Sequence, residues 1–368
     1  MNNTTICSIC GRTITEQNTT EFGGNLLCTD CYDSHTTRCD CCGERIWNSE
    51  SEGNNDITLC RHCYSERYTT CENCGMLIHN DYAFYEDDDD YPYCQECFNE
   101  RRNEAIKSYN YKPEPNFYGS DILFMGVEIE VDKGGEISEN AEKIIEVANA
   151  HDDHIYCKHV GSINDGFEIV SHPMTLDYHT NTMNWPDVFT KAVDMGYRSH
   201  QTSTCGFHIH VNRSAFGKTF EEQEDKISRI VFIIENYWNE LVKFSRRTET
   251  NLNRWANRYG IMTTAKDTYN SAKSKHLGRY VAVNLENYST IEFRMFRGTL
   301  NHKTFLATLQ LVDELCKLAI NTDDKYTESL SWSEFVSSIY PEEKPELIQY
   351  LKDKRLYVNE PSNEREEM

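Results

Sequence analysis

The sequence has few basic residues for its length. Its 368 residues include 37 lysines and arginines against 60 aspartates and glutamates, which leaves a formal net charge of −23. A surface of this charge repels phosphate groups, so the composition argues against binding to nucleic acid or to anionic membranes. The chain has no apolar run of the ~18–20 residues that a membrane span requires, and its first residues do not follow the pattern of a secretion signal. We therefore expect a soluble, cytoplasmic protein.

The sequence also lacks the glycine-rich loops that hold nucleotides in many enzymes. Neither a Walker-type loop nor a Rossmann fingerprint is present, so any nucleotide would have to be bound by other elements, such as a sheet. Hydrophobic residues make up only 38% of the chain, but 5 tryptophans, 22 tyrosines and 16 phenylalanines can fill a core. The length is sufficient for two or three domains of ~100–200 residues each.

Cysteine, by contrast, is abundant. Twelve of the 16 cysteines form CxxC pairs before residue 98, and the pairs that begin at residues 7, 39 and 71 repeat with a period of 32. The pattern C-x2-C-x17–19-C-x2-C therefore occurs three times, a spacing typical of zinc ribbons. The predicted zinc ligands are Cys7, Cys10, Cys28 and Cys31; Cys39, Cys42, Cys60 and Cys63; and Cys71, Cys74, Cys94 and Cys97.

The spacing of these cysteines suits a structural role for zinc. Two intervening residues allow both thiolates of a pair to reach one tetrahedral ion, and four thiolates leave no open position for catalysis. A ribbon this short buries little apolar surface, so the metal would supply its folding free energy. Three alternatives remain open: disulfides in a secreted protein, substitution by His35 or His62 as ligands, and the use of Cys41, against which the 32-residue period argues.

The segment that carries the cysteines is strongly acidic. Residues 1–100 hold five arginines, no lysine and nineteen acidic residues, a net charge of −14. Zinc-bound thiolates would add further negative charge. This charge favours docking of a peptide or protein, such as a basic partner, over binding to nucleic acid.

The composition changes along the chain in a way that suggests domains. We predict three tandem zinc ribbons in residues 1–100, at about 5–35, 37–67 and 69–100, and a linker rich in proline and tyrosine at 101–121. A second domain would cover 122–355 and a flexible polar tail 356–368. Amphipathic periodicity and capping residues predict helices at 138–151, 186–195, 219–244 and 302–321, and another that begins after Ser331.

Four strand-like runs in the second domain carry charged side chains on one face. They are GVEIEV from residue 126, FEIVS from 167, GFHIHV from 206 and TIEFRM from 290. Because side chains alternate along a strand, each run has one apolar face and one charged face. The charged positions are Glu128, Glu130, Glu168, His208, His210, Glu292 and Arg294. The pattern predicts an α+β fold in which an antiparallel sheet, backed by helices, presents a basin of carboxylates, imidazoles and arginines.

An amphipathic strand with a solvated outer face also alternates, but solvated faces usually mix lysine, threonine, serine and glutamate. The outward positions here are almost all glutamate, histidine or arginine, which favours a functional basin. Carboxylates with a histidine suit hard cations such as Mg²⁺, and arginines suit phosphate or carboxylate groups. The combination indicates phosphoryl transfer, which depends mainly on positioning and charge neutralisation.

The motifs GVEIEV, GFEIVSHP, TCGFHIHV, RYVAVNL and STIEFRMFRGTL, taken in this order over about residues 122–320, resemble the amidoligases. These enzymes are relatives of glutamine synthetase and glutamate–cysteine ligase, and zinc-ribbon arrays precede some members. The resemblance implies a glutamine-synthetase-like sheet that binds ATP and Mg²⁺. It also implies a reaction in which a carboxylate is phosphorylated to an acyl phosphate and an amine then forms the amide. A small-molecule amine or amino acid, a peptide or protein substrate recruited by the ribbons, and an oligomer are further expectations.

The resemblance also assigns roles to individual residues. The implied Mg²⁺ ligands are Glu128, Glu130, Glu168, His208 and Glu292. Arg294 would hold the transferring phosphoryl group and complete a catalytic set with Glu128, Glu130, His208 and Glu292. The implied nucleotide or substrate contacts are His210, Arg279, Arg297, Lys158, Tyr280 and Asn284. Arg297 has the opposite strand parity to Glu292 and Arg294, so alternation alone would place it on the other face of the sheet.

One position departs from the family pattern. Many members carry an aspartate where this chain has Val160, and Asp165 in the next loop is a candidate substitute. Two alternatives stay open: a non-enzymatic adaptor on a degenerate ligase scaffold, which the departure supports, and a metal-dependent hydrolase that uses the same glutamates and histidines to activate water. A hydrolase would not require Arg279 and Arg294, and an adaptor gives no reason to retain so many mutually repelling carboxylates.

Overall fold

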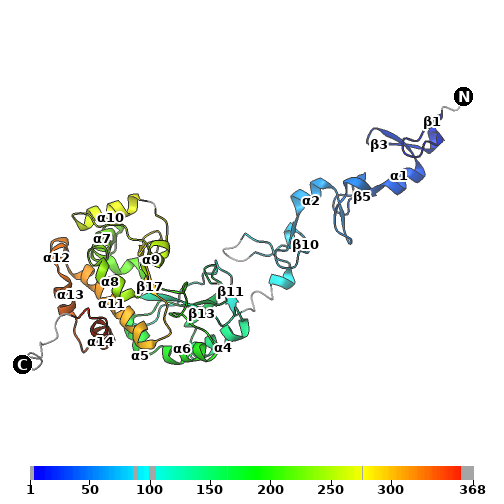
Figure 1. Ribbon diagram of the computed structural model, residues 1–368. Helices are drawn as coiled ribbons and strands as arrows, with labels where there is room; N and C mark the ends of the chain where they lie inside the picture. The colour runs from blue at the N-terminus through cyan, green and yellow to red at the C-terminus, as the bar shows by residue number, and fades with distance from the viewer. Residues whose placement is uncertain (1–3, 86–89, 99–104, 164, 276, 358–368) are drawn as a thin grey trace, which may run out of the picture. The chain divides into compact units, whose positions relative to one another are not determined.

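The computed structural model describes residues 4–357 except 86–89, 99–104, 164 and 276, and forms two compact units, Met1–Asn103 and Glu104–Met368 (Figure 1). The start of the predicted linker and residues 358–368 of the predicted tail lie outside the described residues. Among the helices that are described, none has the length and apolar character to span a bilayer.

The smaller unit repeats a pattern of short antiparallel hairpins and a short helix. The first repeat contains β1 (Thr4–Ile6), β2 (Thr13–Thr15), η1 (Glu16–Asn18), β3 (Thr19–Phe22), β4 (Asn25–Cys28) and α1 (Thr29–His35). The second contains β5 (Thr36–Arg38), β6 (Arg45–Trp47), η2 (Asn48–Glu50), β7 (Glu52–Gly53), β8 (Thr58–Leu59) and α2 (Arg61–Arg67). The third contains β9 (Tyr68–Thr70), β10 (Leu77–His79) and η3 (Asn80–Tyr82). The helices α1 and α2 each begin after a cysteine that caps them: the thiols of Cys28 and Cys60 accept the N–H groups of Cys31 and Cys63.

The larger unit is built on a seven-stranded sheet of order β11-β13-β14-β12-β15-β17-β16. Its strands are β11 (Ile106–Lys107), β12 (Met125–Val131), β13 (Ile155–Lys158), β14 (Phe167–Ser171), β15 (Gly206–Asn212), β16 (Val283–Asn284) and β17 (Thr290–Arg297). All neighbours are antiparallel except β11 and β13, which are parallel, so the sheet is mixed at one edge. The expectation of a wholly antiparallel sheet missed this edge, because Ile106 lies in the stretch predicted as a linker.

The described part of the larger unit also contains helices, most of which contribute buried residues to one hydrophobic core with this sheet. They are α4 (Ser138–Ala148), α5 (Leu176–Asn181), α6 (Trp185–Asp194), η4 (Arg213–Phe216), α7 (Phe220–Asn236), α8 (Trp238–Ser245), α9 (Glu249–Trp255), α10 (Ala265–Ser274), α11 (His302–Asn321), α12 (Asp324–Ser329), α13 (Trp332–Ser338) and α14 (Pro345–Asp353). Val127, Ile209 and Phe293 point into one core together with Phe305 of α11. The ring of Phe305 stacks on Phe207 at 5.1 Å. The apolar halves of the strands therefore form the core, as their alternation predicts, and the fold is a mixed α+β architecture.

The predicted helix ends agree with the structure in some places and differ in others. The capping boxes Thr219/Glu222 and Ser331/Glu334 are both present. The predicted helix 219–244 is two helices, because the chain leaves helical geometry at Tyr237 (φ −102°, ψ 33°). Ser138 is the first residue of α4 and not its cap; its hydroxyl instead accepts the N–H of Ala105 at 2.9 Å.

A buried histidine predicts how the larger unit responds to acid. His179 is fully buried between Met125 O, 2.9 Å from its Nε2, and Trp185 Nε1–H, which donates to its Nδ1 at 3.1 Å. Burial lowers the pKa of His179 to about 4, against about 6.5 for a free histidine. Below pH 6.5 the unfolded chain therefore binds a proton that the folded chain does not, and folding stability falls as the pH falls.

We expect this single group to lower the free energy of unfolding by about 3 kcal/mol between pH 7 and pH 4, and by only a few tenths of a kcal/mol more below pH 4. Urea unfolding across this range should therefore show a weaker pH dependence in a His179→Gln variant, whose side chain does not titrate. An equal pH dependence in both proteins would contradict the assignment.

Candidate active site and zinc centres

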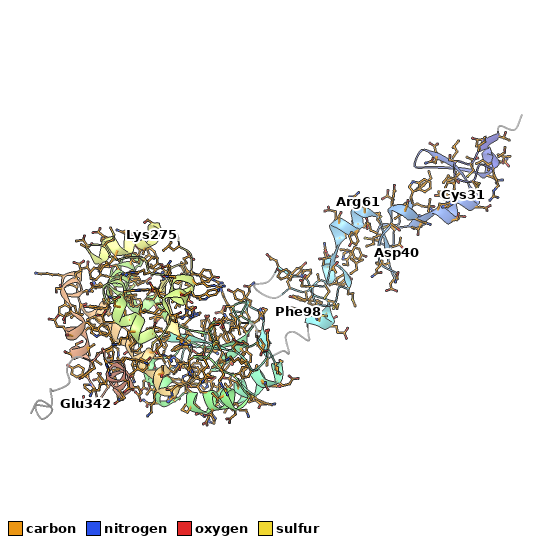
Figure 2. All side chains as sticks on the ribbon, viewed as in Figure 1. Cys31, Asp40, Arg61, Phe98, Lys275 and Glu342 are labelled. Carbon is orange, nitrogen blue, oxygen red and sulfur yellow. The ribbon has the colours of Figure 1, made fainter. Side chains whose placement is uncertain are left out.

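The cysteines of the smaller unit gather into three clusters of four. Within each cluster the Sγ atoms all lie within 4.8 Å of one another, and the members are the three sets expected from the 32-residue repeat. Figure 2 shows the side chains of the unit, with Cys31 of the first cluster labelled. All 16 cysteines, every one of them described, have free thiols, which disagrees with the disulfide alternative. His35, His62 and Cys41 belong to none of these clusters.

Each cluster has the donor set of a structural zinc site. Four sulfur donors within one coordination shell match tetrahedral Zn²⁺, whose Zn–S distance is ~2.3 Å. In the first cluster the N–H of Cys28 points to Cys7 Sγ at 3.4 Å. Hydrogen bonds from the N–H groups of Cys10 and Cys28 lower the pKa of Cys7 to about 6, which favours the thiolate form that zinc requires. The three clusters are therefore compatible with three zinc ions.

In the larger unit, the strand register sets the charged residues of the sheet side by side. Most of them lie opposite another charged or polar residue on the neighbouring strand, on the face away from the core. The facing pairs are Glu128 and His208, Glu130 and Glu168, His210 and Glu292, Lys158 and Glu168, and Asn284 and Glu292. This face is the floor of a cavity of about 750 Å³, within the range of small-molecule sites.

Glu128 lies at the centre of the floor. One of its oxygens, Oε1, lies 3.3 Å from His210 Nε2 and 3.5 Å from Lys158 Nζ, and the other lies 3.3 Å from His208 Nδ1. Burial would raise the pKa of Glu128, but His210 and Lys158 lower it well below its usual range. The neighbouring Glu168 is 4% exposed, and its burial and the repulsion from Glu128 raise its pKa well above its usual range. The floor thus concentrates negative charge that favours a bound cation.

The floor offers two groups of metal-ligating atoms that share one residue. Glu128, His210 and Glu292 form one group, and Glu128, Glu168 and His208 form the other; in each, the ligand atoms lie within 4.8 Å of one another. Carboxylate oxygens with one imidazole suit Mg²⁺ or Mn²⁺, which complete their shells with water or phosphate. Glu128 is therefore the residue that the two groups have in common.

Two residues differ from the metal-ligand set that the family resemblance implies. Glu130, expected as a metal ligand, belongs to neither group; its carboxylate accepts the N–H of Gly206 and, at 3.2 Å, the hydroxyl of Ser162. His210, expected near the nucleotide, belongs to a metal-ligating group. Arg294 forms an ion pair with Glu292, and Asn284 Nδ2 donates to the same carboxylate at 2.8 Å.

The rim of the cavity is aromatic and basic. Arg279 donates hydrogen bonds to the hydroxyls of Tyr109 and Tyr280, the latter at 3.1 Å. The ring of Trp255 meets that of Tyr280 edge-on at 5.6 Å. Tyr109 follows β11, so the stretch predicted as a linker supplies part of the rim. Flat rings and a guanidinium at a cavity mouth provide surfaces on which a planar group can stack.

Most of the predicted contact residues line the cavity. They are Lys158, His210, Arg279, Tyr280 and Asn284, and Arg294 of the predicted catalytic set lines it too. Arg297 does not line it, although a β-bulge between β15 and β17 reverses its parity and pairs it with Gly206 on the basin face. Val160 lines the cavity, whereas Asp165, the candidate substitute for the missing aspartate, does not.

Several residues that line the cavity were not among those expected from the sequence, including Thr204, Trp255, Glu286 and Arg247. Arg247 follows the end of α8, where basic residues are common because they interact favourably with the helix dipole. Its position therefore carried no signal of a site. The aromatic Trp255 at the end of α9 likewise resembles an ordinary packing residue in sequence.

Residues 138–316 match a protein family whose model is described as "Putative amidoligase enzyme". The matched range includes Lys158, Glu168, both histidines of β15, Glu292 and Arg294, but begins after β12, which carries Glu128 and Glu130. No curated protein matches the chain. The match supports an amidoligase and hence a ligase-type enzyme, and it does not extend to the cysteine repeats.

Proposed function

We propose that this chain is an ATP- and Mg²⁺-dependent carbon–nitrogen ligase that joins a carboxylate to an amine through an acyl phosphate. The observation that carries the proposal is the cavity floor, where Glu128 is shared by two metal-ligating groups and Arg294 lies beside Glu292. Phosphoryl transfer needs cations and a guanidinium around the transferred group, and this floor supplies residues for both.

The roles of the residues follow from their positions. Glu128, Glu168, Glu292 and the two histidines would hold Mg²⁺, which supplies charge neutralisation at the phosphate oxygens when it is bound. Arg294 would neutralise charge on the phosphoryl group. Lys158, 3.4 Å from Glu168, limits repulsion among the carboxylates and faces the cavity. The rim of Arg279, Tyr280 and Trp255 would hold the planar part of the nucleotide.

The reaction has two balanced steps. A carboxylate oxygen of the acid substrate attacks the γ-phosphorus, and the bond to the leaving ADP oxygen breaks. The amine nitrogen then attacks the acyl carbon, the bond to phosphate breaks, and the amine loses a proton as the amide forms. The acidic cysteine unit would recruit a peptide or protein that contributes either the carboxylate or the amine, and a small amine or amino acid would supply the other group.

Trapping with hydroxylamine tests the proposed intermediate. A ligase that forms an acyl phosphate should convert added hydroxylamine to an acyl hydroxamate when given ATP, Mg²⁺ and its carboxylate substrate. ATP consumption without hydroxamate, across a broad pool of acids, would instead favour the metal-dependent hydrolase. Absence of any ATP consumption, with the fold intact, would favour the non-enzymatic adaptor, for which Val160 in the cavity wall is the supporting observation.

A further inference from the structure

Arg247 is a buried cation of the cavity wall without a role in the reaction as proposed above. Its side chain lines the cavity, the residue is only 8% exposed, and its buried Nη1 atom has no hydrogen-bond partner among the residues that the structure describes. In the described part of the chain, no carboxylate lies within ion-pair distance of its guanidinium. Burying a cation without a partner is costly, so a group of this kind is expected to have a ligand.

The backbone before Arg247 is held in an uncommon conformation. The helix α8 ends at Ser245, and Arg246 then adopts a left-handed conformation (φ 63°, ψ 7°) that non-glycine residues rarely occupy. The Ser245 hydroxyl accepts the N–H of Arg247 at 3.2 Å, which stabilises the turn. Conformations of this kind persist where the surrounding structure requires them, and they gather at functional sites. Here the turn directs Arg247 to the cavity.

Gly206 leaves the space in which Arg247 meets the floor of the cavity. A Cβ atom at residue 206 would lie 2.5 Å from Arg247 Nη2 and 2.6 Å from His208 Nε2, closer than real Cβ contacts. The guanidinium and the imidazole therefore converge over the backbone of this glycine. Any larger residue would have to displace one of them.

A second guanidinium in the same cavity also has an unused donor. The Nε atom of Arg294 is buried and has no hydrogen-bond partner within the described ranges of the chain. Burial lowers the pKa of Arg247 to about 10; repulsion from Arg294 and Arg297 acts in the same direction, and attraction to Glu130 opposes it. Like charges with unpaired donors around one cavity are the arrangement that an anion stabilises.

We propose that Arg247, which lies over Gly206, and Arg294 form an oxyanion site that binds an anionic oxygen group of the substrates. Planar guanidinium groups match the oxygens of both phosphate and carboxylate, so the ligand is either a phosphate group of the nucleotide or the carboxylate of the acid substrate. The identity of that ligand rests on the proposed ligase function, but anion binding itself does not.

Calorimetric titration of the full-length, zinc-loaded protein with inorganic phosphate and with acetate, in the presence of Mg²⁺, tests the site. We expect Arg247→Met to weaken the binding of one of these anions by about 10–100-fold, the range for loss of a charged hydrogen bond. Arg247→Lys should lose less anion affinity than Arg247→Met, because lysine keeps the positive charge and lacks only the planar arrangement of donors. Gly206→Ala should weaken the binding of the same anion, because the methyl group of alanine would displace the Arg247 guanidinium.

The matched control is Lys243→Met. It removes one positive charge from the exposed side of α8, the helix that precedes Arg247, and lies outside the cavity. It should leave anion binding unchanged, and circular dichroism should show all variants folded. Loss confined to phosphate would assign the site to the nucleotide, and loss confined to acetate to the acid substrate. Equal binding in folded Arg247→Met and wild-type protein, or no millimolar binding of either anion by wild type, would overturn the proposal.

These outcomes are separate from those of the ligase assay. If the wild-type protein binds phosphate through Arg247 but forms no hydroxamate and consumes no ATP, the oxyanion site stands and the ligase proposal fails. If ligation occurs and Arg247→Met changes neither anion binding nor the KM of ATP or of the acid, the ligase proposal stands and the site fails.

Discussion

Replacing Glu128 with glutamine is expected to lower ATP-dependent ligation by at least about 10²–10³-fold, the order of effect seen when one major electrostatic contact to a transition state is lost. The reason is that Glu128 belongs to both metal-ligating groups, with Glu292 on one side and Glu168 on the other. A neutral amide keeps the shape of the side chain but cannot neutralise two cations. The rate of ADP formation measures the effect on the reaction.

Metal binding provides the second measurement on this variant. Glu128→Gln should weaken Mn²⁺ binding, measured by electron paramagnetic resonance of the free ion, while the melting temperature shows that the fold is kept. The matched control is Glu139→Gln, which removes a carboxylate from the exposed first turn of α4 in the same unit. Wild-type ADP formation and wild-type Mn²⁺ affinity in the Glu128→Gln protein would contradict the assignment of this residue.

Removing zinc is expected to unfold the cysteine unit and to leave the larger unit folded. The core of the first repeat contains few buried residues besides its cysteines, namely Ile14 and Leu27. Domains below ~40 residues rarely fold without a metal or a disulfide, and structural zinc contributes ~10–16 kcal/mol per site in finger peptides. The larger unit has its own extensive core, to which Trp185, Phe207 and Phe305 belong.

Hydrogen exchange followed by mass spectrometry measures this effect separately for each unit. We expect three zinc ions per chain by elemental analysis, and loss of protection in residues 4–98 alone after chelation. A Cys7→Ser variant should lose one zinc ion and the protection of the first repeat. Cys41→Ser is the matched control and should keep three zinc ions, since Cys41 is in none of the clusters. Unchanged protection in residues 4–98 after zinc is stripped would contradict a folding role for the metal.

The parts of the fold that the sequence predicts well are those set by local periodicity. The two thiols of a CxxC pair lie close in space because only two residues separate them. The 32-residue repeat then shows which pairs belong to the same cluster. Alternation along β12, β15 and β17 places Glu128, His208 and Glu292 on one face for a similar reason. Both patterns follow from the geometry of neighbouring residues.

What the sequence does not predict depends on contacts between distant segments. The β-bulge that reverses the parity of Arg297 arises between β15 and β17, about 90 residues apart, and no pattern within β17 reveals it. The edge strand β11 is two residues long and forms only by pairing with β13. Arg247 reaches the cavity because of one left-handed residue after α8, and in sequence it resembles any basic residue at a helix end.

Mass spectrometry of ATP turnover is the most direct test of carboxylate–amine ligation by this chain. The zinc-loaded protein would be incubated with ATP, Mg²⁺ and a pool of amino acids, polyamines and peptides that includes basic sequences, with Glu128→Gln as the inactive control. A carboxylate–amine ligase should give ADP, phosphate and a new product lighter than its two precursors by one water. ATP consumed without such a product, or ATP left intact by a folded protein across the pool and across captured protein substrates, would contradict a carboxylate–amine ligase.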